Sequence, residues 1–265
     1  MVSAGAAVRV RSLTRRVRVL VIAAFGVALL APATLSAQRG RGGGGGAPAT
    51  GQSGAALDLT GYWVSVITED WKYRMVTPKA GVFDAIPLSA EGRKIGQAWD
   101  AARDQSSGEA CKAYGAAGLM RMPTRLNISW ENPNTLRVDT DAGTQTRRFH
   151  FGTPPAPGER SWQGHSVAVW ENATAGRGGE RRGNLRVVTT NLRPGYLRRN
   201  GAPYSEQATV TEFWDMNTLP NGDRWLTITT QVVDPLYLTR PYITTSDFKK
   251  LPDSAGWSPS PCSTT

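Results

Sequence analysis

The sequence predicts a mainly β protein, an antiparallel barrel or strongly curved sheet of lipocalin-like plan with one helix. Three observations lead to this prediction. Apolar and polar residues alternate with a period of two in several short segments, turn-forming residues separate these segments, and a single stretch shows helical spacing. Roughly eight to ten strands without an internal repeat favour a meandering barrel over a sandwich of hairpins or a propeller.

The first elements of the folded chain are predicted to be two strands and a helix. Segments 62–67 and 71–76 are rich in aromatic and β-branched residues, which favour strands. The helix is predicted over 90–103, because a start signal at 87–89 precedes apolar residues at helical spacing, namely Ile95, Ala98, Trp99 and Ala102.

The rest of the chain has the pattern of strands separated by turns. Asn221-Gly222 lies between segments 209–215 and 224–233 and predicts a hairpin. Segment 173–183 is rich in Gly and Arg and is predicted to be a surface loop. The alternation of apolar and polar residues is clearest in three segments, 136–140, 185–189 and 226–232.

The first 56 residues are expected to lie outside the folded domain. Five arginines precede the apolar stretch 19–30, which is too short to span a bilayer and has the size of a signal-peptide core. Residues 1–37 are therefore predicted to be a signal peptide, with an uncut membrane anchor as the alternative. The Gly-rich segment 38–56 is predicted to be a flexible tether and 57–265 a single β domain. A periplasmic or extracellular protein follows, with no transmembrane segment after cleavage.

Charge and cysteine content fit this prediction of export. Half of the formal net charge of +10 lies in the signal segment, and no concentrated basic face or nucleic-acid motif is visible, so nucleic acid is not an expected partner. Cys111 and Cys262 are expected to form a disulfide that holds the C-terminal tail to the domain. The spacing of His150 and His165 matches no metal motif, and neither a metal nor a cofactor is predicted.

Several motifs resemble a known group of proteins. Segment 164–171 reads GHSVAVWE and segment 185–191 reads LRVVTTN, while 69–71 and 200–206 read EDW and NGAPYSE. The chain resembles a large group of uncharacterised secreted proteins of acidobacteria and related soil bacteria, with the pattern GYSVGxWE…LVVxTT. The resemblance implies export but no particular activity. His165 stands where that group usually has Tyr.

Glu171 and Glu212 are the candidate catalytic carboxylates. Glu212 shares an alternating face with Val210 and Trp214, so it is expected to point into an enclosed space, where a carboxyl group can serve as a general acid. The alternative is a structural ion pair with an arginine, for which the sequence offers Arg147, Arg148 and Arg193.

The candidate ligand-binding residues are aromatic or lie in one polar loop. Nine tryptophans suit a ligand-lined cavity, although ordinary core packing is the alternative. The loop 191–204 follows an apparent central strand and is expected to form the rim of a pocket, or to be fixed by pairing of an arginine. The predicted ligand-binding residues are Trp71, Arg148, His150, Trp170, Asn191, Arg193, Tyr204, Glu206 and Trp214.

Three functions follow from the sequence. The first is a monomeric exported protein that binds a small apolar or amphipathic ligand in a Trp-lined pocket. The second is a secreted hydrolase that uses paired carboxylates, and the third is an envelope-associated structural module. Whether the protein is an enzyme is left open, since fold likeness does not determine activity. A deep cavity would favour the first function, two carboxylates across a cleft the second, and a solid core the third.

Overall fold

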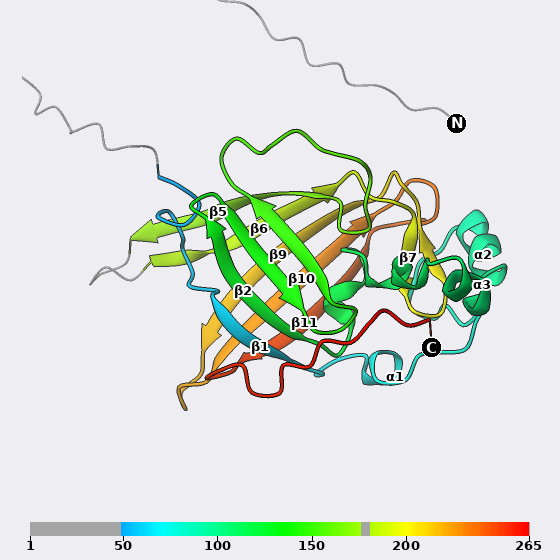
Figure 1. The fold of residues 1–265 in the computed structure, drawn as a ribbon, viewed down its shortest axis with the longest axis horizontal. Helices are drawn as coiled ribbons and strands as arrows, with labels where there is room; N and C mark the ends of the chain where they lie inside the picture. The colour runs from blue at the N-terminus through cyan, green and yellow to red at the C-terminus, as the bar shows by residue number, and fades with distance from the viewer. Residues whose placement is uncertain (1–48, 176–180, 265) are drawn as a thin grey trace, which may run out of the picture. The chain divides into compact units, whose positions relative to one another are not determined.

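The computed structural model describes residues 49–175 and 181–264. Within this part of the chain, nine strands close a barrel in the order β1-β11-β10-β9-β6-β5-β4-β3-β2 (Figure 1). This closed barrel confirms the predicted fold class. The barrel strands are β1 (Gly61–Val66), β2 (Arg125–Asn132), β3 (Thr135–Thr140), β4 (Gln145–His150), β5 (His165–Ala175), β6 (Arg181–Thr190), β9 (Thr209–Thr218), β10 (Arg224–Val233) and β11 (Tyr242–Lys250).

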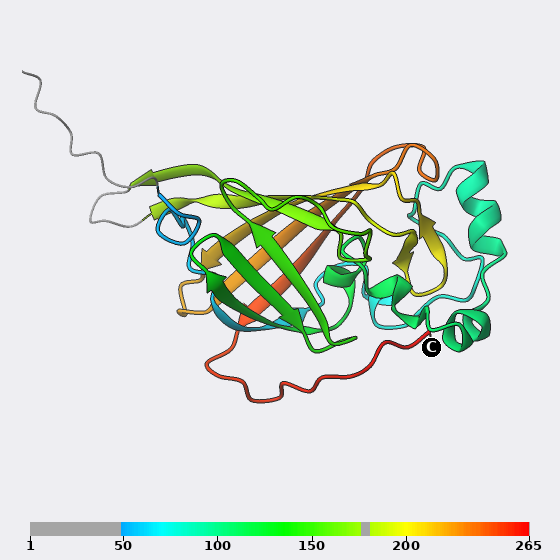
Figure 2. The ribbon, with the colours of Figure 1, turned by 45° about the horizontal axis from the view of Figure 1, so that its top comes forward.

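The remaining elements lie together at one end of the barrel, and we call them the cap (Figures 1 and 2). An apolar cluster that includes Phe83, Leu192 and Val232 joins the cap to the barrel. The cap consists of α1 (Trp71–Arg74), α2 (Ala90–Gln97), α3 (Ala101–Ser106), the 3₁₀ helices η1 (Ala110–Tyr114) and η2 (Leu119–Arg121), and the hairpin β7 (Gly195–Arg198) and β8 (Ala202–Tyr204).

The alternating segments point apolar side chains into the barrel, as the period of two requires. The hairpin predicted at Asn221-Gly222 joins β9 to β10, and the amide of Gly222 donates to the carbonyl of Leu219 at 2.9 Å. The interior is filled by side chains that are each at most 1 % exposed: Trp63, Leu126, Ile128, Leu136, Val138, Phe149, Leu185, Val187, Trp214, Leu226, Ile228 and Phe248.

The barrel has one weak seam. β4 and β5 pair in parallel through two residue pairs, Phe149 with Ser166 and His150 with Val167. Each other pair of neighbouring barrel strands is antiparallel and is joined by four or more residue pairs. Closure at this seam therefore depends on side chains more than closure elsewhere.

A buried ion pair crosses the seam inside the barrel. Arg147 of β4 donates to both carboxylate oxygens of Glu212 on β9, at 2.8 and 2.6 Å, and both side chains are 0 % exposed. The same guanidinium donates to Thr189 at 3.3 Å, and Thr189 shares a hydrogen bond with Ser166. The pair thus connects β4 to β9 across the two intervening strands, β5 and β6.

The predicted disulfide between Cys111 and Cys262 is confirmed. It joins η1 to the C-terminal segment, which runs back along the outside of the barrel to the cap (Figure 2). The closed loop spans 151 residues, and the chain-entropy model assigns such a closure roughly 5 kcal/mol of stabilisation.

Two predicted elements differ in the structure. Segment 71–76 is not a strand, because its first residues form α1, whose amides at Tyr73 and Arg74 donate to the carbonyl of Asp70. The helix predicted over 90–103 is divided into α2 and α3, since Asp100 accepts from the amide of Arg103 and starts a new helix. In both places, hydrogen bonds between residues three or four positions apart set the start of a helix.

The segment predicted as a tether is partly folded. Gly51 is buried, its amide donates to Asn134 at 2.8 Å, and its carbonyl accepts from the indole of Trp170 at 2.7 Å. A side chain at Gly51 would clash with Phe151, which explains the glycine. The ordered chain therefore begins before residue 57. Strands β5 and β6 occupy most of the predicted surface loop, and its centre, 176–180, lies outside the described residues.

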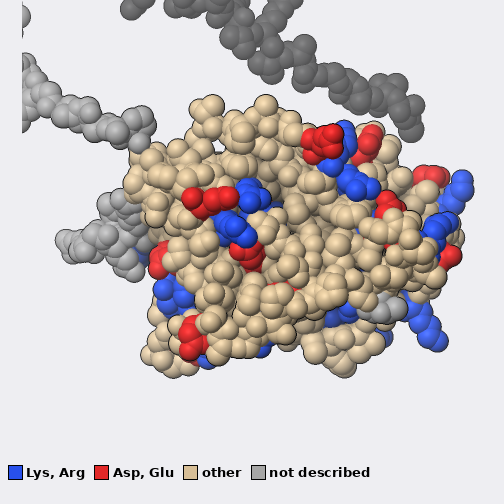
Figure 3. All heavy atoms as spheres, in the orientation of Figure 1, with Lys and Arg blue, Asp and Glu red and all other residues tan. Residues whose placement is uncertain are grey.

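Charged side chains of both signs are interspersed on the face shown in Figure 3, which carries no broad patch of one sign. Exposed arginines pair with carboxylates, as Arg148 does with Glu131 at 2.7 Å. No helix in residues 49–175 or 181–264 is long and apolar enough to cross a bilayer.

Replacing Glu212 by Gln should reduce the free energy of unfolding by about 3–5 kcal/mol, because it leaves the buried charge of Arg147 without a counter-ion. Urea unfolding measures this change. The control is Glu131→Gln, which breaks an exposed pair and should cost about 1 kcal/mol or less. Equal losses in the two variants would contradict a central role for the buried pair.

Candidate functional site

The two candidate catalytic carboxylates are each engaged by an arginine. Glu212 is held by Arg147 in the filled interior of the barrel. Glu171 accepts a hydrogen bond from Arg186 on the outer face, where both side chains are about one-third exposed. The structure therefore does not bring the two glutamates together, and for Glu212 it realises the structural ion pair that the sequence offered as the alternative.

Two of the predicted ligand-binding tryptophans are packing residues. Trp214 is fully buried and meets the ring of Phe149 edge to face at a centroid distance of 5.3 Å. Trp170 stacks on Phe151 at 5.6 Å and donates to the carbonyl of Gly51. Both tryptophans stabilise the barrel and its N-terminal segment.

Arg148 and His150 lie on the outside of the barrel beside the seam. The ring of His150 stacks on that of His165 at a centroid distance of 5.5 Å and an interplanar angle of 22°. Partial burial, together with the positive charges of His165 and Arg148, lowers the pKa of His150 below its ordinary value of 6.5. The stacked rings of His150 on β4 and His165 on β5 therefore reinforce the seam from outside.

The predicted loop residues belong to the base of the cap. Arg193 pairs with Glu109 at 3.1 Å and lies over the ring of Trp162 at 4.5 Å. Asn191 donates to the carbonyl of Gly158, and Glu206 lies 3.7 Å from Arg160. Tyr204 is fully buried, and burial raises the pKa of its hydroxyl group. Asn191, Arg193 and Glu206 therefore hold the segments that flank the hairpin β7–β8. Tyr204 lines a hollow of about 120 Å³, together with Ile95 and Lys112.

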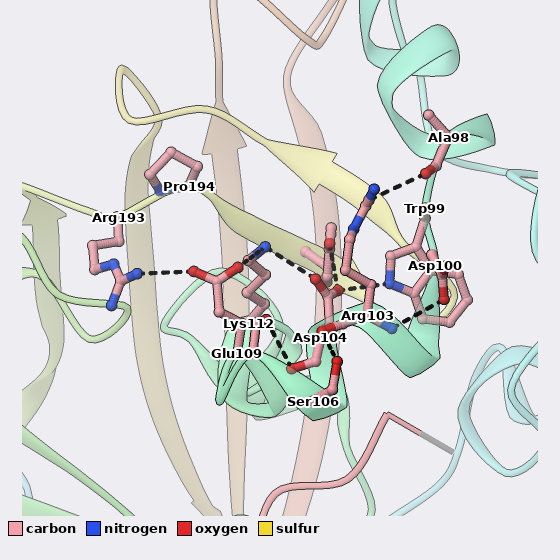
Figure 4. A network of polar contacts seen from close by, with 12 residues as sticks. Ala98, Trp99, Asp100, Arg103, Asp104, Ser106, Glu109, Lys112, Arg193 and Pro194 are labelled. Atoms are coloured by element: carbon pink, nitrogen blue, oxygen red, sulfur yellow. Dashed lines mark hydrogen bonds and ion pairs between the residues drawn. The ribbon is translucent and has the colours of Figure 1, made fainter.

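A network around Asp104 ties the cap elements together (Figure 4). Asp104 is 2 % exposed and accepts from the indole of Trp99 at 2.9 Å, the hydroxyl of Tyr196 at 2.7 Å and the ammonium group of Lys112 at 3.1 Å. Lys112 also pairs with Glu109. Burial and the carboxylate of Asp104 raise the pKa of Tyr196, so its hydroxyl group stays a donor. The network holds β7 in a fixed position against α3 and η1.

A pocket lined by arginines lies where α1, η2 and β7 meet. Glu69 pairs with Arg74 at 2.9 Å, and Asp70 pairs with Arg121 at 2.8 Å. We call this hollow the arginine pocket, and its lining residues are Tyr73, Arg74, Thr77, Gly118, Arg121, Met122, Pro123, Leu197, Arg198 and Arg199.

Close packing of three elements brings these arginines together. The Nε of Arg74 donates to the carbonyl of Arg121 at 2.9 Å, which joins α1 to η2. A Cβ atom at Gly118 would lie 2.9 Å from the carbonyl oxygen of Tyr196, so glycine is needed for η2 to approach β7. The guanidinium of Arg198, at the end of β7, stacks over the ring of Tyr73 at 4.8 Å.

An apolar groove adjoins the arginine pocket, and Tyr73 lines both. The groove has a volume of about 350 Å³, and we call it the α1 groove. Its members include Trp71, 67 % exposed, and Val76, 66 % exposed. The full lining comprises Trp71, Lys72, Tyr73, Val76, Pro78, Lys79, Val82 and Asp84. Trp71 is the one predicted ligand-binding residue that lines this groove.

Comparison of the chain with models of protein families, with curated proteins and with solved structures finds no match. Within residues 49–175 and 181–264, no group of three or more His, Cys, Asp or Glu side chains is placed to hold a metal ion.

Sequence reasoning missed the arginine pocket. Arg74, Arg121 and Arg198 are far apart in the chain and form no short-range motif. Two of the motifs that carry the resemblance lie next to residues of the pocket: EDW at 69–71 and NGAPYSE at 200–206. Neither motif indicates that three arginines meet, since that depends on the packing of α1, η2 and β7.

Replacing His165 by Tyr should raise the pKa of His150, because it removes a positive neighbour and keeps an aromatic ring in the stack. An NMR titration of the imidazole measures this pKa. In the unchanged protein, the unfolded chain binds this proton more readily than the folded one, so stability falls as the pH drops below about 6.5. An unchanged or lower pKa of His150 in the variant would contradict the assigned cause.

Proposed function

We propose that this protein is exported and binds a small apolar or amphipathic ligand in the α1 groove. The observation that carries the proposal is a concentration of exposed apolar side chains. Among the described residues, nine large apolar side chains are exposed, and four of these lie within residues 71–82: Trp71, Met75, Val76 and Val82. Three of these four side chains line the groove.

The size and composition of the groove fit a small ligand. Its volume of about 350 Å³ falls within the range of about 300–1,000 Å³ that is usual for ligand pockets. A ligand in the groove removes apolar surface from water, which contributes about 25 cal/mol for each Å² buried. Lys72, Lys79 and Asp84 stand among the lining residues and provide polar groups that would orient a ligand.

Export is supported by the disulfide and by the N-terminal sequence. The bond between Cys111 and Cys262 suits an oxidising compartment such as the periplasm. The predicted signal peptide, residues 1–37, lies outside the described residues.

The direct test is native mass spectrometry of the mature protein purified from the periplasm of its host, before and after denaturation. A small apolar or amphipathic molecule that is lost on unfolding supports the proposal and identifies the ligand class. A bare protein mass that stays bare after incubation with alkyl probes counts against it.

Replacing Trp71 by Ala should weaken the binding of a simple alkyl probe, decanol, about tenfold, because the exposed indole supplies the largest apolar contact in the groove. Titration calorimetry measures the affinity. Ile243→Ala is the matched control, since Ile243 is 59 % exposed on β11 and does not line the groove. The location of the site is refuted if both variants bind decanol as the unchanged protein does.

A second candidate function is an envelope-associated structural module. The filled interior of the barrel favours a structural module, because its buried side chains serve stability. This function requires no small-molecule ligand. The same mass measurement therefore separates the two candidates.

A further inference from the structure

We propose that the arginine pocket binds a carboxylate, and that the ligand of the α1 groove is therefore an amphipathic carboxylate. This inference rests on the proposed function, since it assigns the polar end of the ligand whose apolar part would lie in the groove. It is carried by a separate set of residues, on α1, η2 and β7.

Two nearly inaccessible arginines line the pocket with unused donors. The side chain of Arg74 is 1 % exposed and that of Arg121 is 10 % exposed. Among the described residues, Nη2 of Arg74 and Nη1 of Arg121 have no hydrogen-bond partner, and the Glu69 carboxylate is 4.0 Å from the latter. A buried guanidinium nitrogen without an acceptor costs free energy, which an anion in the pocket would remove.

A third arginine adds to the same pocket. Nη2 of Arg198 donates to the carbonyl of Asp84 at 3.1 Å, while its buried Nη1 has no partner among the described residues. Arg198 is thus held in place by one nitrogen and by the ring of Tyr73, while its other terminal nitrogen is buried without a partner. Three arginines that line the same hollow therefore each have one buried terminal donor without a hydrogen-bond partner among the described residues.

The cationic lining of the pocket suits an anion. Four arginines line it, Arg74, Arg121, Arg198 and Arg199. The carboxylates of Glu69 and Asp70 pair with the first two, whereas Arg198 donates to a backbone carbonyl. Burial, and to a lesser extent the charge of Arg121, lowers the pKa of Arg74. Guanidinium groups bind carboxylates by paired hydrogen bonds.

The size of the pocket suits a carboxylate. Its volume of about 30 Å³ accommodates about two water-sized groups, which matches the two oxygens of a carboxylate.

The apolar groove begins next to the pocket. Tyr73 lines both hollows, and Asp84, whose carbonyl holds Arg198, lines the groove. An alkyl chain that lies on Trp71 and Val76 can thus extend from a carboxylate near Arg198. The two hollows form one site with a charged end and an apolar end.

The test compares three alkyl probes of equal length, decanoate, decanol and decylamine, titrated into the full protein at low salt. Decanoate should bind about tenfold or more tightly than decanol, and decylamine should bind more weakly than decanol. Arg198→Gln should lower the ratio of decanoate to decanol affinity to about one. Arg198→Lys keeps the charge but not the paired donors, so it should retain part of the preference.

Arg137→Gln is the matched control. Arg137 is an arginine of β3 whose side chain is 40 % exposed and pairs with Asp139, away from the lining of either hollow. Arg137→Gln should leave the affinities for decanoate, decanol and decylamine unchanged. Thermal unfolding of each variant checks that the fold is retained.

The outcomes separate the two proposals. Equal binding of decanoate and decanol, or a preference that survives Arg198→Gln, overturns the carboxylate site and leaves the apolar groove in place. Binding of none of the probes overturns the proposed function itself. Tighter binding of decyl phosphate than of decanoate overturns the choice of a carboxylate.

Discussion

The buried pair of Arg147 and Glu212 is the constraint on which the barrel depends. Two charges removed from water carry a large desolvation cost, which is offset when each donor and acceptor is paired in good geometry. The pair spans β4 to β9 across the parallel seam, where two residue pairs alone join the backbones. A slip of β4 by one residue would turn Arg147 outward and leave Glu212 unpaired. The pair therefore selects one register as well as one closure.

Filling the barrel has a consequence for where a ligand can bind. Core side chains pack around the ion pair and fill the interior of the barrel. The proposed ligand site therefore lies in the cap. Loops and small elements on a rigid scaffold are common places for binding, because they vary without disturbing the core. The Asp104 network and the disulfide at η1 hold the cap in place. Its arginines can then be kept close together despite their mutual repulsion.

Arginines are buried at two places, in the barrel interior (Arg147) and in the arginine pocket, and their partners differ. Inside the barrel, both terminal nitrogens of Arg147 donate to one carboxylate, while its Nε has no partner among the described residues. In the arginine pocket, Arg74 and Arg121 pair with two carboxylates, and Arg198 donates to a backbone carbonyl. The first arrangement stabilises the fold, whereas the second is the site that we propose for a carboxylate. The difference lies in the count and placement of acceptors around each guanidinium.

The sequence by itself determined the features that depend on local pattern. Alternation predicted the barrel strands, Asn221-Gly222 predicted the hairpin, and the even cysteine count predicted the disulfide. Tertiary structure decided which arginine pairs with Glu212, and it brought Arg74, Arg121 and Arg198 to one pocket. These outcomes arise between residues far apart in the chain. Local periodicity carries no information about such pairs, because it records which face a side chain occupies and not what it meets there.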